Sequence, residues 1–273
     1  MGLFDLFEDA SRNIDNRREA RRIMARAKEL VEEGDEIYSK AYEKVSSYAS
    51  ETEYRIIQHD KFKKELLQKL GRTTKATMIS FKNFNIDSKI DRPDISSSAS
   101  GFQGDLQSFS NITSSIIANP FPMDAVSFLF DEVDLYEAKR TRDEARRYKD
   151  RMRGERDKLY AYKDKMSEIR TFIDQEKETL NKLAAKLERG IDELNKGMTK
   201  SSFTEDEAIR LKGINKIIEM LYNTLSTNFI DNNCMITNEY KKNYDLMVDL
   251  NSQIPESPDT TDWIGIFRTI TGV

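Results

Sequence analysis

The most constraining feature of the sequence is a series of apolar residues spaced seven apart along its second half. The series consists of Met152, Leu159, Met166, Ile173, Leu180, Leu187 and Leu194. A strict seven-residue apolar period keeps one stripe of a helix against its neighbours and is typical of coiled coils and helical bundles. Glu176 interrupts the intermediate positions of this stripe. We interpret it as a polar residue that sets the alignment of packed helices rather than as a catalytic carboxylate.

Three long helices are predicted, over residues 17–71, 124–198 and 204–251. In the first, apolar and small residues alternate in steps of four and three, as in a coiled-coil seam. The third begins at a capping box, Thr204-Glu205-Asp206-Glu207. The sequence therefore predicts an all-α protein. Because the helices have matched lengths, we expect an elongated antiparallel bundle of long coiled-coil-like helices joined by connections at opposite ends.

The remaining segments differ in composition from these helices. Residues 72–123 form an insert rich in Ser, Asn and Phe, and residues 106–123 carry no charged side chain. We expect this Ser-rich insert to be apical, capping one end of the bundle. Residues 1–16 form a short amphipathic segment, and residues 252–273 form a linker followed by a second one.

Composition restricts the chemistry available to the chain. One cysteine and one histidine exclude an internal disulfide framework and a multi-histidine metal centre. The 11 glycines among 273 residues argue against nucleotide-binding α/β folds, whose phosphate loops use glycine. We interpret His59 as a residue of the helix seam or surface and Cys234 as a small buried thiol. We therefore expect no catalytic residues, no metal, no cofactor and no small-molecule substrate.

Large apolar side chains gather in the two end segments and the insert. An exposed cluster of such residues is a liability on a monomer, so each must dock on the bundle, on a partner or on a membrane. The predicted partner or membrane contacts are Leu3, Phe4, Leu6, Phe7, Phe102, Leu106, Phe109, Ile116, Phe121, Trp263, Ile264, Ile266 and Phe267.

Two stretches are rich in arginine. Their first interpretation is a solvated helix face on which interspersed acids form ion pairs one turn away. The second is a surface that binds nucleic acid or anionic lipid. The candidate anion contacts are Arg17, Arg18, Arg21, Arg22, Arg146, Arg147, Arg151 and Arg153.

These patterns favour a non-enzymatic interaction or scaffold subunit that docks a protein partner or copies of itself through helix faces and apolar ends. The alternative is a membrane-active helical protein that uses residues 102–130 or the termini. Acidic residues in the first amphipathic segment weaken that alternative, because anionic lipid repels them. A second alternative is a nucleic-acid-associated subunit that uses the arginine-rich stretches. We expect a cytoplasmic protein, peripheral to a membrane under the first alternative.

Overall fold

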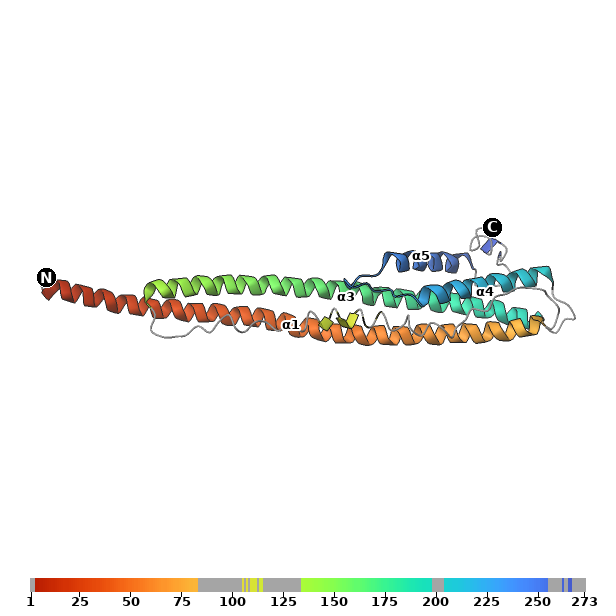
Figure 1. The fold of residues 1–273 in the computed structure, drawn as a ribbon, viewed down its shortest axis with the longest axis horizontal. Coiled ribbons are helices and arrows are strands. Elements are labelled where there is room, and N and C mark those ends of the chain that lie inside the picture. Colours follow the sequence, from red (N-terminus) through yellow and green to blue (C-terminus); the bar gives the residue numbers. More distant parts are fainter. Residues whose placement is uncertain are drawn as a thin grey trace. The chain divides into compact units, whose positions relative to one another are not determined.

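The computed structural model is helical throughout most of the part of the chain that it describes (Figure 1). The helices are α1 (Leu3–Lys82), α3 (Leu135–Gly197), α4 (Glu205–Leu225) and α5 (Asn238–Gln253). The described residues are 3–82, 105, 107, 109–111, 113–114, 134–197, 204–254, 262 and 265–266. Their one β pairing is an isolated antiparallel bridge between Ile230 and Ile236. The predicted all-α class is confirmed.

The chain divides into two compact units. Unit 1 contains residues 1–50 and 114–164, and unit 2 contains residues 51–113 and 165–273. The helices α1 and α3 each contribute to both units. Most of the predicted apical insert and most of the C-terminal segment lie outside the described residues.

In unit 1, α1 and α3 pack through a seam of small side chains. Along α1 the buried positions Ala20, Ala27, Gly34 and Ala41 are spaced seven apart. Along α3 the heptad continues toward the N-terminus, beyond the predicted series, through the buried Ala138 and Ala145. Gly34 marks a close approach, because a Cβ there would lie 3.0 Å from the Tyr148 ring and 3.3 Å from Cγ of Met152.

The two long helices run parallel, so the predicted antiparallel arrangement is wrong for this pair. In unit 1, Glu33 contacts Lys149 and Lys44 lies over the ring of Tyr160, so the residue numbers rise together. In unit 2, Arg55 pairs with Asp174 and Lys69 pairs with Glu188, in the same sense. Matched helix lengths do not fix direction, because a connection as long as residues 83–134 can return the chain to the starting end.

In unit 2, the end of α3 packs against α4 and α5. Figure 1 shows α4 returning along α3, and Arg210 of α4 lies 3.8 Å from Glu193 of α3. Helix α5 runs parallel to α3, since Thr179 contacts Tyr244 and Lys186 bonds to the carbonyl of Asn251.

The helix predicted over residues 204–251 is two helices. The predicted capping box is present, with reciprocal hydrogen bonds between Thr204 and Glu207 at the start of α4. The break after α4 arises from turn chemistry. The side chain of Asp231 accepts hydrogen bonds from the backbone N–H groups of Asn233 and Met235, and Cys234 has a φ of 60°. Thr237 then caps the start of α5.

The first helix is longer than predicted. Helix α1 runs without a break from Leu3 to Lys82, so it joins the predicted amphipathic segment at residues 1–16 to the predicted helix at 17–71 and extends into the predicted insert. The start of the described α3 is Leu135, where the Asp134 side chain accepts hydrogen bonds from the backbone N–H groups of Tyr136 and Glu137. All seven predicted heptad residues of α3 are buried, which confirms them as its packing stripe.

Candidate functional site

Unit 2 contains a cluster of buried polar side chains, here called the polar cluster. The described residues of unit 2 supply it from α1, α3, α5 and the segment at residue 105. Each of its members is at most 7% exposed; they are His59, Asp60, Lys63, Asp105, Glu176 and Tyr240. Buried charges are costly unless they are paired, so this concentration requires an account of each group.

Glu176 lies at the centre of the polar cluster. The Tyr240 hydroxyl donates a 2.6 Å hydrogen bond to Oε1 of Glu176, and Nε2 of His59 lies 3.1 Å from Oε2. Burial opposes the charge on Glu176, but the nearby Lys63 ammonium and the contacts with His59 and Tyr240 hold its pKa below the ordinary value. Burial also lowers the pKa of His59, which favours its neutral form.

Lys63 is fully buried and lies between aromatic rings. Its Nζ atom is 4.6 Å from the ring centroid of Phe229 and 4.9 Å from that of Tyr240. It has no hydrogen-bond partner among the described residues. The ammonium is therefore stabilised by two ring faces and by the negative charge of Glu176, and cation–π attraction of this kind strengthens where water is excluded.

The other two carboxyl groups of the polar cluster, those of Asp60 and Asp105, have pKa values raised toward neutral pH. Burial raises the pKa of Asp60 to about 7 and that of Asp105 to about 6, while Lys63 acts in the opposite direction on both. Oδ1 of Asp105 accepts a 3.0 Å hydrogen bond from the backbone N–H of Ile230. Oδ1 of Asp60 has no partner among the described residues. The polar cluster can therefore take up or release protons between about pH 6 and pH 7.

The acid and base groups of the polar cluster are buried. No group of three metal-ligating side chains occurs among the described residues. Glu176 and His59 were identified from the sequence separately, with no contact expected between them. Lys63 and Asp105 were not identified from the sequence. One signal was available for Lys63, since His59 and Lys63 are two polar residues one helical turn apart on the side of α1 that carries Ile56 and Leu70.

Two predicted apolar contact residues are buried in unit 2. Phe109 has 0% and Ile266 has 4% of its surface exposed, so both side chains pack inside the chain. Four more occupy positions in the first turns of α1 with side chains that are not described: Leu3, Phe4, Leu6 and Phe7. The others fall outside the described residues: Phe102, Leu106, Ile116, Phe121, Trp263, Ile264 and Phe267.

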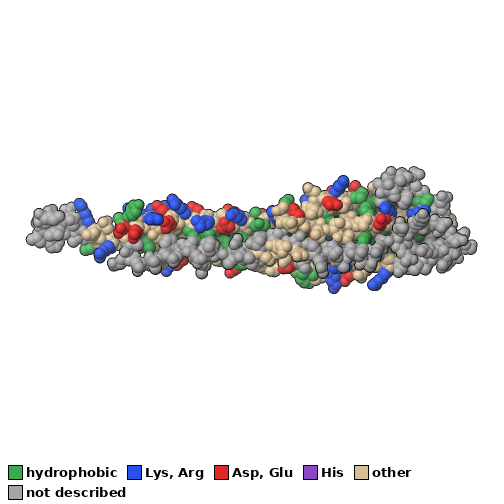
Figure 2. Space-filling model, in the orientation of Figure 1, with side chains coloured by type: hydrophobic (Ala, Val, Ile, Leu, Met, Phe, Trp, Pro, Cys, Tyr) green, Lys and Arg blue, Asp and Glu red, His purple; other side chains and the backbone are tan. Residues whose placement is uncertain are grey.

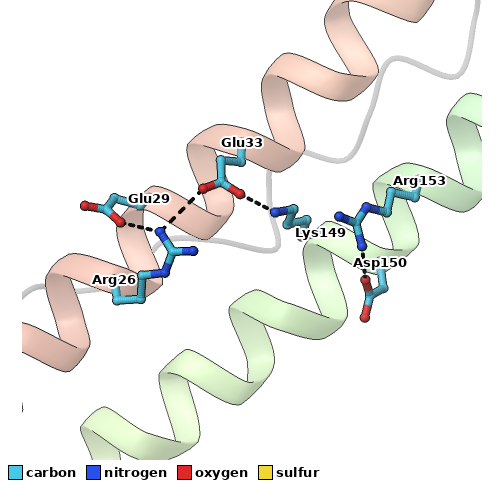
Figure 3. Close-up of polar contacts among 6 residues, drawn as sticks. All are labelled: Arg26, Glu29, Glu33, Lys149, Asp150 and Arg153. Carbon is cyan, nitrogen blue, oxygen red and sulfur yellow. Dashed lines mark hydrogen bonds and ion pairs between the residues drawn. The ribbon is translucent and has the colours of Figure 1, made fainter.

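All eight predicted arginine contacts are exposed and belong to unit 1. On α3, Arg146 and Arg153 each lie within ion-pair distance of an aspartate one turn earlier, at 3.9 Å and 3.1 Å. Figure 3 shows the contact of Arg153 with Asp150. The others on that helix are Arg147 and Arg151. Figure 2 shows basic and acidic side chains interspersed over the visible face.

The four arginines near the start of α1 are different, and are here called the arginine face. They are Arg17, Arg18, Arg21 and Arg22. None of them forms an ion pair with another described residue, whereas basic residues farther along α1 do. Arg26 contacts Glu29 and Glu33, and Lys40 bonds to Glu36 (Figure 3 shows the contacts of Arg26).

Comparison with known proteins assigns no relative to the chain. No family model, curated protein sequence or solved structure matches it.

Proposed function

We propose that this protein is a non-enzymatic helical interaction subunit that docks a protein partner or copies of itself through exposed helix faces and its apolar ends. The observation that carries the proposal is the construction of unit 1. There, α1 and α3 pack through one stripe, in which small side chains of α1 meet larger ones of α3 such as Tyr148 and Met152. Most of the other described positions of both helices are exposed and charged. Two helices packed in this way bury few side chains between them, and most of their side chains remain on the surface.

Polar contacts between the helices of unit 1 support a fixed presentation of that surface. Glu33 joins Arg26 on its own helix to Lys149 on α3, as Figure 3 shows. The buried Tyr148 donates a hydrogen bond to Asp35. These contacts fix the rotation of α1 and α3 about their own axes relative to each other. A docking surface formed by both helices requires such a fixed arrangement.

Unit 2 offers an exposed apolar pair on α1. Tyr54 is 62% exposed and Ile57 is 43% exposed, and residues three apart on a helix lie on the same face. Apolar anchors at this spacing are how a helix commonly contacts a partner protein. The pair is small, so it supplies one contact of a larger interface together with the apolar ends.

Light scattering of the purified full chain tests this proposal, because it measures mass directly. A variant that lacks residues 1–14 and 262–273 and a double variant Tyr54→Lys, Ile57→Lys should each lose assembly while the rest of the chain remains helical. Tyr136→Lys is the matched control, since Tyr136 is an exposed tyrosine on α3, at 78%. Equal mass in all four proteins, alone and with cell extract, contradicts the proposal.

A further inference from the structure

The arginine face occupies one side of α1. At about 100° per residue, its four members span an arc of about 140° on the helix. The buried positions Ala20 and Ala27, which pack toward α3, lie on the opposite side of this arc. The guanidinium groups are therefore directed away from the seam, and α3 leaves them accessible.

The arrangement of charge on this face is unfavourable in the isolated chain. Arg17 and Arg21 are four apart, as are Arg18 and Arg22, and like charges at this spacing destabilise a helix. Neither pair has an acidic partner among the described residues, although the same helix pairs its charges regularly from residue 26 onward. An external anion would relieve the repulsion and is the complementary ligand for such a face.

The same side of the helix is apolar just before the arginines. Ile14 is 54% exposed and falls near the middle of the arc that the arginine face covers. Because α1 is continuous from Leu3, positions 3, 6, 7 and 10 fall on this side too, and the sequence places Leu, Leu, Phe and Ala there. The acidic positions 5, 8 and 9 fall toward the other side of the helix.

We propose that residues 3–22 of α1 dock on the surface of an anionic phospholipid membrane. An apolar strip followed by arginines on one helix face matches the acyl boundary and the phosphate layer of such a surface. A nucleic acid backbone offers no apolar layer, and residues 12–28 contain no aromatic side chain on which a base could stack. No helix among the described residues has the length and apolar character needed to cross a bilayer.

Vesicle flotation of the full chain tests this proposal. The probes are vesicles of phosphatidylcholine alone and vesicles with about 30% phosphatidylserine, at about 50 mM and about 300 mM salt. The test variant replaces all four residues of the arginine face by glutamine, which keeps helix propensity and removes charge. The matched control makes the same change at Arg146, Arg147, Arg151 and Arg153 of α3, which are also exposed and in unit 1. Ile14→Glu tests the apolar part.

The expected result is binding of the natural chain to phosphatidylserine vesicles that weakens at higher salt. The variant of the arginine face should lose at least about tenfold in partitioning, and Ile14→Glu at least about threefold, while the α3 control stays within about twofold. Three outcomes overturn the proposal: no binding at low salt, equal loss in both arginine variants, or binding of duplex DNA as tightly as of vesicles. This proposal shares residues 3–14 with the protein-docking proposal, but the two have separate readouts, because protein docking is tested by mass without lipid.

Discussion

Asp60 gives the sharpest test of the energetics of unit 2. It is 7% exposed, and burial raises its pKa from the ordinary 3.8 to about 7. The folded chain therefore holds a proton at this carboxyl that the unfolded chain has already released. Stability from this group is greatest at low pH and is lost as pH rises through the folded-state pKa, which is the reverse of a salt-bridged aspartate. Asp60→Asn removes the titration and keeps the shape.

The size of the effect follows from the pKa itself. A pKa raised from 3.8 to about 7 corresponds to about 4 kcal/mol of lost stability well above pH 7, at ~1.4 kcal/mol per unit. Part of that loss is already present at about pH 5, because the unfolded carboxyl is then ionised. Between about pH 5 and about pH 8 the natural chain should lose about 2–3 kcal/mol through Asp60 that Asp60→Asn does not lose.

Urea unfolding followed by far-ultraviolet circular dichroism at the two pH values measures this difference. Comparison of variant with natural chain removes most of the contribution of groups that titrate in both, such as His59 and Asp105. The matched control is Asp245→Asn, an exposed aspartate on α5. If the free energies of unfolding of Asp60→Asn and the natural chain change in parallel from pH 5 to pH 8, the assigned burial cost is wrong.

Three further predictions concern packing and pairing. Gly34→Ala should destabilise the seam of unit 1, because its Cβ would meet the Tyr148 ring at 3.0 Å, whereas Gly154→Ala meets nothing within 4 Å and should stabilise by up to about 1 kcal/mol; thermal unfolding compares them. Glu176→Gln should cost about 3–5 kcal/mol by leaving Lys63 without its counter-charge, and adding Lys63→Met should recover much of that loss in urea unfolding. Tyr240→Phe should cost about 1–3 kcal/mol, since it removes the 2.6 Å hydrogen bond to Glu176; no change in its unfolding midpoint would exclude that bond.

The sequence was sufficient to predict which residues of α3 are buried, but not which residues of different helices contact each other. The heptad of α3 is buried at every predicted position because the apolar period belongs to one helix alone. Direction and register belong to a pair of helices, so the contact between His59 and Glu176 could not be read from either stripe. The helix predicted over 204–251 fails for a local reason. Its apolar pattern continues across Asp231, Asn233 and Cys234. The prediction followed this pattern and therefore ran the helix through residues that form a turn.

Heptad packing by itself determines the alignment of α1 and α3 only in part. Ala20, Ala27, Gly34 and Ala41 are small residues seven apart, so a slip of one heptad would again place a small residue at three of these four seam positions, with an alanine in place of Gly34 opposite Tyr148. The polar cluster removes this freedom. A slip of seven residues would place Glu176 at the level of Thr52 or Leu66 instead of His59, and would separate the buried charges of Glu176 and Lys63. This cost supports the interpretation of Glu176 as a residue that sets register.

Replacing three residues of the polar cluster by apolar residues tests its effect on helix register separately from its effect on stability. His59→Leu, Lys63→Met and Glu176→Leu together should keep the chain helical and about as stable, because apolar replacement of buried charges is often neutral. The slipped alignment should then become populated, displaced by about 10 Å along the helix axis. Spin labels at the exposed positions Gln68 and Asn181 report this distance, since burial raises the pKa of the native Cys234 thiol to about 11 and keeps it unreactive. One distance population in both proteins would show that the seam alone selects the register.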